Sequence, residues 1–109
     1  MHKYELGIIV VPTLEEEALK AEHEWVMEQI ARFGGVVDKV DNWGRRRLAY
    51  EIQKHLEGYY CFIYIDGPPE MPGQIEERLR IRESIIRFMF VRRDDLEKKA
   101  AASAKEVPV

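Results

Sequence analysis

The sequence predicts an α+β domain in which four strands and two helices follow the order β-α-β-β-α-β. Three observations lead to this prediction. Four segments alternate apolar with polar side chains or are rich in β-branched and aromatic residues, as strands are. Two further segments repeat apolar residues at helical spacing. Gly or Pro separates most of these segments, and a chain of 109 residues is long enough for one such domain.

The first half of the chain predicts a strand, a helix and a long extended segment. Residues 3–11 alternate between two faces, which is the pattern of a strand. Thr13 begins a capping-box pattern, so a helix should follow and extend to about Phe33. The next strand is expected over residues 36–52. Gly44 within it predicts a bulge or a bend.

The second half predicts a turn over residues 53–58 and a strand over 59–66. A second helix is expected over 71–81 and a last strand over 84–92. Two β-α-β halves with right-handed crossovers give a four-stranded antiparallel sheet with both helices on one face. The predicted arrangement is therefore ferredoxin-like. It should occupy residues 1–93 and leave residues 94–109 as a flexible C-terminal tail.

This topology leaves one face of the sheet without helices. On the third strand the set that ends in Asp66 is the less uniformly apolar one, so we expect it to point outward. Ile9, Val11, Arg87 and Val91 should join it. Because a contiguous apolar patch marks an interface, we predict that a protein partner binds at Tyr60, Phe62, Tyr64 and Met89. The alternatives are that the strands have the reverse phase or that a loop or the tail covers the patch.

Positive charge is concentrated in a chain whose formal net charge is -3. The densest run is Arg45–Arg47, which leads directly into Leu48 and Tyr50, and we expect these two residues to anchor the strand to the fold. Residues 78–93 carry six arginines and one acid, whereas residues 14–28 carry six acids and one base. A polyanion would sense these local fields, which extend about 8–10 Å at physiological salt, and not the net charge.

The sequence contains no obvious catalytic or metal-binding constellation. The histidines at positions 2, 23 and 55 have no metal-ligand spacing with Cys61. Cys61 lies among apolar strand residues, which predicts an inert core thiol. A single cysteine and an N-terminus without a signal-peptide layout favour a cytoplasmic protein with no membrane association. We expect no cofactor and no small-molecule substrate, although a ferredoxin-like enzyme domain stays an alternative.

An open sheet face with aromatic residues and arginines is also typical of single-stranded RNA-binding modules of the RNA-recognition-motif type. The third strand of such a module reads Lys/Arg-Gly-Phe/Tyr-Gly/Ala-Phe-Val-x-Phe/Tyr. Residues 57–64 read EGYYCFIY. Glu57 reverses the required charge, and Cys61 replaces an aromatic residue that would stack on a base. This module is therefore the weaker alternative.

The stretch GRRRLAYEIQKHLEGYY, residues 44–60, resembles the most recognisable part of bacterial small-subunit (30S) ribosomal protein six, the S-six family. The first strand from Tyr4 to Pro12 and the segment RLRIRESIIRFMFVRR are similar to the family as well. The resemblance covers about residues 2–93, and the family has the fold predicted above. Glu51 departs from the pattern, because many members have proline or another residue there.

The resemblance implies a structural, non-catalytic component of the small ribosomal subunit. Members of the family bind the central domain of 16S rRNA together with ribosomal protein eighteen, as a heterodimer. Carried over position by position, the resemblance implies RNA-binding roles for Lys3, Arg45, Arg46, Arg47, Arg87, Arg92 and Arg93. From the uneven charge and the outward apolar residues we also expect that a basic partner, docked on the apolar sheet or its edge, supplies the cations that this acidic chain lacks.

Overall fold

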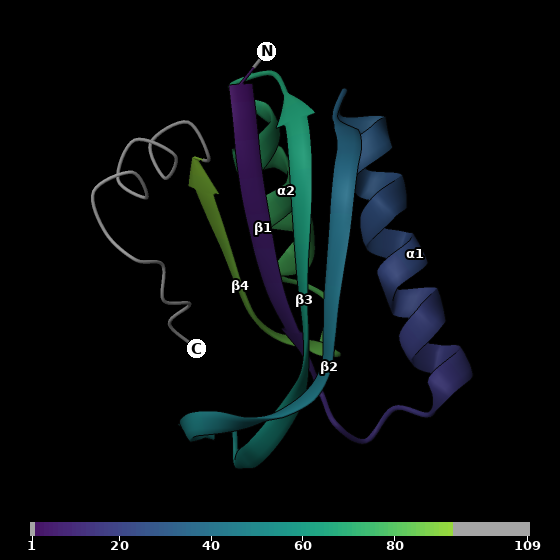
Figure 1. Ribbon diagram of the computed structural model, residues 1–109, viewed down its shortest axis with the longest axis vertical. Coiled ribbons are helices and arrows are strands. Elements are labelled where there is room, and N and C mark those ends of the chain that lie inside the picture. Colours follow the sequence, from purple (N-terminus) through teal and green to yellow (C-terminus); the bar gives the residue numbers. More distant parts are fainter. Residues whose placement is uncertain (1, 93–109) are drawn as a thin grey trace.

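The computed structural model describes residues 2–92. Its elements are β1 (His2–Val10), α1 (Glu16–Arg32), β2 (Val36–Ile52), β3 (His55–Gly67), α2 (Met71–Leu79) and β4 (Ile85–Arg92). The strands form one sheet in the order β2-β3-β1-β4, and every neighbouring pair is antiparallel. Figure 1 shows the sheet from the face that carries no helix, with α2 behind β1 and β3. The ferredoxin-like prediction is confirmed, whereas Arg93 and the expected tail lie outside the described residues.

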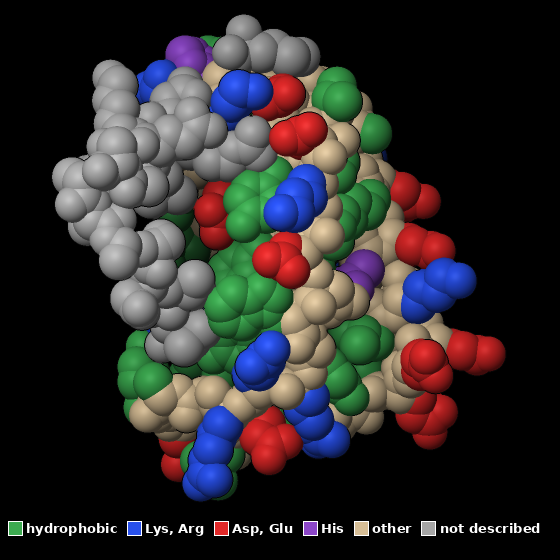
Figure 2. Space-filling view, in the orientation of Figure 1, with side chains coloured by type: hydrophobic (Ala, Val, Ile, Leu, Met, Phe, Trp, Pro, Cys, Tyr) green, Lys and Arg blue, Asp and Glu red, His purple; other side chains and the backbone are tan. Residues whose placement is uncertain are grey.

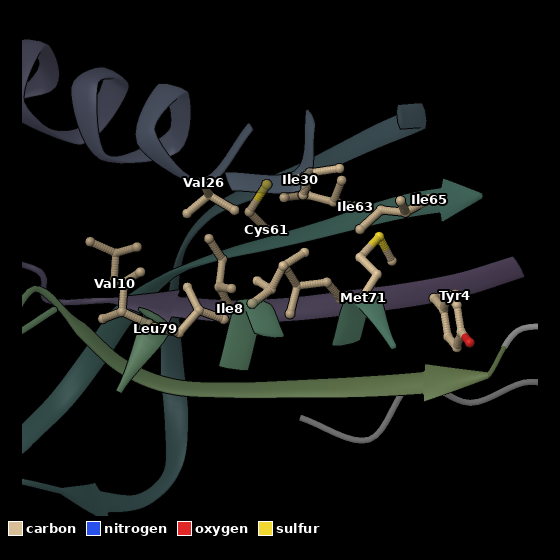
Figure 3. Packing of buried hydrophobic residues seen from close by; sticks show 13 residues of the cluster. Tyr4, Ile8, Val10, Val26, Ile30, Cys61, Ile63, Ile65, Met71 and Leu79 are labelled. Carbon is tan, nitrogen blue, oxygen red and sulfur yellow. The ribbon is translucent and has the colours of Figure 1, made fainter. Parts of the chain in front are cut away.

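The main core lies between the sheet and the two helices. The strand period of two and the helix period of 3.6 bring their apolar faces together here, as the sequence predicts (Figure 3). Each fully buried Ile or Leu in it contributes about 1.5–3 kcal/mol through burial. The core residues from the two central strands and the helices are Tyr4, Leu6, Ile8, Val10, Val26, Ile30, Cys61, Ile63, Ile65, Met71, Ile75 and Leu79.

Both helices are shorter than predicted. The N-cap of α1 is Glu15, and its side chain makes no capping hydrogen bond. The capping box predicted at Thr13 is therefore wrong. The early glutamates of α1 still suit the positive end of the helix dipole. Helix α2 ends at Leu79, two residues before the predicted end.

The hairpin formed by β2 and β3 is longer than predicted, and its far end curls across the sheet toward the β4 side (Figure 1). The turn needs only residues 53 and 54, which have φ values of 51° and 69°. Strand β3 therefore starts at His55, and the prediction of a turn over 53–58 is wrong. Gly44 has φ of 76° at a register shift in β2, which confirms the predicted bend. We call residues 45–57 the hairpin arm.

The hairpin arm covers part of the open sheet face. Leu48 packs against Tyr60 and Ile86, and these three buried residues form a second hydrophobic cluster opposite the helices. Partly buried side chains surround this cluster: Ile9, Val11, Trp43, Ile52 and Phe62. The outward direction predicted for Tyr60 and Phe62 of β3 is therefore correct. The alternative that part of the chain covers the apolar patch also applies, at the end of the face where the hairpin arm lies.

A bidentate ion pair ties α1 to the segment between α2 and β4. Nε and Nη2 of Arg82 donate to the two carboxylate oxygens of Glu22 at 2.9 and 2.8 Å. The guanidinium also lies 4.3 Å from the ring centroid of Trp25. Glu22 is only 5% exposed, so this pairing satisfies a buried charge. One arginine of the basic segment 78–93 therefore acts inside the fold.

Replacing Gly58 with alanine should destabilise the fold by about 1–3 kcal/mol, because overpacking forces a shift of well-packed neighbours. A Cβ at Gly58 would lie 2.5 Å from Cγ2 of Ile9 and 3.2 Å from the carbonyl oxygen of Val10. Gly73→Ala is the matched control, because a Cβ there meets nothing within 4 Å and the residue lies in α2. It should raise the free energy of unfolding by up to about 1 kcal/mol. Urea unfolding measures the free energy of unfolding of both variants. Equal changes in the two would contradict the close approach at Gly58.

The thiol of Cys61 should be unreactive in the folded protein. Burial, assisted by the charge of Asp41, raises the pKa of Cys61 to about 11. Because the unfolded thiol ionises at a lower pH than the folded one, stability should fall as the pH rises from about 9 toward 11. Alkylation at pH 8 should be slow until denaturant is added, and Cys61→Val should lack this part of the alkaline loss of stability. Rapid alkylation of the folded chain would contradict the assignment.

Candidate RNA and protein interface

The arginine run lies where β2 enters the hairpin arm, and all three side chains are exposed. Arg45, Arg46 and Arg47 stand opposite Tyr59, Gly58 and Glu57 of β3, respectively. Strand β2 is at the edge of the sheet, so one side of this segment faces solvent. The local pairing to β3 therefore presents the cations at an accessible edge.

Arg45 is engaged within the protein. Its Nε lies 2.9 Å from Oε1 of Glu57, and its Nη2 donates to the carbonyl oxygen of Pro12 at 3.3 Å. The guanidinium also lies 5.8 Å from the ring centroid of Tyr59. Glu57 partly neutralises this arginine, and the bond to Pro12 fixes the base of the hairpin arm beside the end of β1.

Arg46 and Arg47 keep their full charge. Arg46 lies over the indole of Trp43 at 5.4 Å, and its Nε donates to the carbonyl oxygen of the same residue at 3.1 Å. Neither contact removes charge. Within residues 2–92, Arg47 has no ion-pair or hydrogen-bond partner. These two cations are therefore the members of the run that an external anion reaches without displacing a carboxylate.

The other predicted cations lie on β1 and β4. Lys3 forms an exposed ion pair with Asp66 at 3.4 Å. Nη2 of Arg92 lies 2.9 Å from Nδ1 of His2. Arg87 reaches the hairpin arm, where its Nη1 donates to the hydroxyl of Tyr50. The sequence-predicted cations of residues 2–92 thus lie on β1, β2 and β4. On the face that carries no helix, Lys and Arg side chains lie beside hydrophobic ones (Figure 2).

An apolar groove of about 320 Å³ lies between the hairpin arm and the sheet. Leu48 and Tyr50 of the arm line one wall. The strands contribute the rest, and the ring of Phe62 fills the space that a side chain at Gly7 would need, 3.0 Å from the position of its Cβ. Met89, which is 52% exposed, lines the groove from β4. Hydrophobic side chains occupy the middle of this face in Figure 2.

The four predicted partner-binding residues have different environments. Phe62 and Met89 line the groove and are accessible. Tyr64 lies farther along β3, with the ammonium of Lys39 5.6 Å from its ring centroid. Tyr60 points to the predicted face but is only 3% exposed, because Leu48 lies over it. Its expected exposure is therefore wrong. Burial also raises the pKa of Tyr60, partly offset by Arg87.

The sequence reasoning was wrong about Tyr50 of the hairpin arm and missed Trp43, which lies just before the arm. Tyr50 was expected to anchor the strand, yet it is 59% exposed and that expectation is wrong. Leu48 is the anchor, as expected. Trp43 was not singled out, although it packs edge-on to Phe62 with ring centroids 4.8 Å apart. An aromatic residue directly before Gly44, at a bend, was the available signal.

The described residues contain no cluster that indicates other chemistry. Among residues 2–92, no three acidic, histidine or cysteine side chains are grouped in a way that could hold a metal ion. No helix in this part of the chain is long and apolar enough to cross a membrane.

Comparisons with known proteins agree with the geometry. The family model for ribosomal protein S6 matches residues 3–92. The small ribosomal subunit protein bS6 of Clostridium novyi is 47% identical over 91 residues, which cover 84% of this chain and 96% of that protein. The same protein of Heliobacterium modesticaldum is 40% identical over 95 residues, 87% of this chain and 99% of the relative.

A solved structure matches over nearly the whole chain. The crystal structure of 30S ribosomal protein S6 from Thermotoga maritima superposes with a TM-score of 0.84 at 35% identity, covering 95% of this chain and 98% of that one. The fold, the sequence match and the length of the match all point to the same family. The chain therefore belongs to the ribosomal protein S6 family, and it is a structural, non-catalytic protein of the small ribosomal subunit.

Proposed function

We propose that this protein binds the central domain of 16S rRNA through its exposed arginines and binds ribosomal protein eighteen, as a heterodimer, through the apolar groove. The observation that carries the proposal is the hairpin arm, which bears two arginines of full charge and forms one wall of the groove. The hairpin arm thus presents cations to a polyanion and an apolar wall to a protein partner.

The RNA-binding half of the proposal rests on the chemistry of arginine. A guanidinium pairs with phosphate through two parallel hydrogen bonds. Double-helical RNA is recognised by shape and backbone, so exposed cations suit it better than base-reading side chains. Arg46 and Arg47 meet this requirement best. Arg45 and Lys3 are paired with carboxylates and should contribute less.

The partner-binding half rests on the groove and on the net charge. An apolar groove that leaves Met89 half exposed gains free energy when an apolar segment covers it. A chain of net charge -3 should bind RNA weakly by itself. A basic partner in the groove would add cations beside the arginines of the arm.

The single-stranded RNA module is the less favoured function. Base stacking on the sheet requires accessible aromatic rings on the central strands. Tyr60 is 3% exposed beneath the hairpin arm, and Cys61 next to it is buried on the opposite face. On its open face, β3 therefore keeps partly accessible rings only at Phe62 and Tyr64 and lacks one at Tyr60.

Replacing Arg46 and Arg47 together with glutamine should weaken binding to a central-domain rRNA fragment in the presence of ribosomal protein eighteen. If each arginine contacts one phosphate, the slope of log K against log salt should fall by about 1.4–1.8 in all. Arg80→Gln is the control, because Arg80 is an exposed arginine at the end of α2, outside the arm. An unchanged slope in the double variant would remove the arm from the RNA interface.

Met89→Asp should weaken binding of ribosomal protein eighteen at least tenfold, because a carboxylate would have to be buried in the apolar groove. Ile81→Asp is the matched control, since Ile81 is 73% exposed and lies between α2 and β4, away from the groove. Titration calorimetry with the purified partner measures both. Equal partner affinities for the two variants would exclude the groove as the binding site of ribosomal protein eighteen. RNA binding that is equally tight with and without this partner would exclude the cooperative part of the proposal.

A further inference from the structure

Tyr50 and Arg87 come from different elements and touch at the groove. Nη1 of Arg87, on β4, donates to the Tyr50 hydroxyl at 2.5 Å, and the guanidinium carbon lies 6.0 Å from the ring centroid. Both side chains are exposed and both line the groove. The contact therefore joins the hairpin arm to the edge strand at the far side of the sheet from β2.

The chemistry of the two groups fixes the direction of this hydrogen bond. A guanidinium has donors only, so the phenol oxygen must accept. The hydroxyl proton of Tyr50 is then not used by Arg87, and no acceptor for it lies within residues 2–92. The other N–H groups of Arg87 also have no hydrogen-bond acceptor there. The pair thus presents several unused donors to solvent.

The charge of this pair differs from that of the other arginine pairs. Glu57 compensates Arg45, and Glu22 compensates Arg82. Tyr50 carries no charge, so Arg87 keeps its own while the hydrogen bond limits the movement of its side chain. A held, uncompensated guanidinium beside a free phenol donor is suited to a tetrahedral oxyanion.

We infer that Tyr50 and Arg87 together bind one phosphate of the RNA backbone, with the guanidinium donating to one or two of its oxygens and the Tyr50 hydroxyl donating to another. The bound phosphate would bridge the hairpin arm and β4. This inference rests on the proposed rRNA binding and adds to it a neutral residue, Tyr50, as a direct ligand. It also predicts that RNA holds the arm against the sheet.

The test compares Tyr50→Phe with Arg87→Gln in the complex of full-length protein, ribosomal protein eighteen and a central-domain rRNA fragment. Tyr50→Phe should lower RNA affinity by about tenfold or more, the loss expected for one hydrogen bond to a charged group. Its salt slope should not change, because no charge is removed. Arg87→Gln should lower both the affinity and the slope, the slope by about 0.7–0.9. In the double variant, removal of the hydroxyl should have no further effect.

Controls separate a phosphate ligand from a merely structural residue. Tyr59→Phe removes a hydroxyl on the helix-covered face and should leave RNA affinity unchanged. The unfolding free energy of Tyr50→Phe should match that of the unmodified protein. Because Tyr50 lines the groove but keeps its ring in this variant, any loss of partner affinity should be smaller than the loss of RNA affinity. The inference is overturned if Tyr50→Phe binds RNA normally, or if it lowers RNA affinity as much in the Arg87→Gln background as it does alone. It is also overturned if Tyr50→Phe lowers partner affinity as much as RNA affinity. If the Arg46 and Arg47 variants weaken RNA binding while Tyr50→Phe does not, this inference alone fails; if the unmodified complex does not bind the fragment, the proposed function fails with it.

Discussion

The close approach of β3 to β1 at Gly58 is the constraint on which the hairpin arm and the groove depend. With no side chain at this position, β3 can pass against Ile9 and carry the end of the hairpin across the sheet. Leu48 then reaches Tyr60 and Ile86 and closes the second hydrophobic cluster. The groove, the placement of the arginine run and the contact between Tyr50 and Arg87 all follow from this packing.

Local patterns in the sequence were sufficient to predict the topology and the main core, but not what covers the open face. Alternation on β3 correctly gives the direction of Tyr60. It cannot show that Leu48, twelve residues earlier, lies above that ring, because a curl of the hairpin depends on long-range packing at Gly58. The same limit applies to β4, where a register shift beside Ile9 and Val10 puts Ile86 on the open face, next to Arg87. Regular alternation does not predict this.

Charge shows a second limit of sequence reasoning. The segments 14–28 and 78–93 read as separate acidic and basic fields, yet Glu22 and Arg82, 60 positions apart, neutralise each other in the fold. Among the cations predicted to bind RNA, pairing separates Lys3 and Arg45 from Arg46, Arg47 and Arg87. A count of arginines therefore overestimates the field that a ligand meets. Arg46, Arg47 and Arg87 differ from the others in forming no ion pair with a carboxylate among residues 2–92, which only the tertiary structure determines.

The hairpin arm also makes the two proposed ligands interdependent. It forms a wall of the groove and bears Arg46, Arg47 and Tyr50, so one movement of the arm changes both surfaces. By linkage, a partner that fixes the arm and an RNA that fixes the arm must each favour the other equally. An exposed hydrogen bond such as that between Tyr50 and Arg87 contributes only about 0.5–1.5 kcal/mol. The buried contact of Leu48 with Tyr60 and Ile86 must therefore set the resting position of the arm, while the exposed contact is weak enough for ligands to modulate.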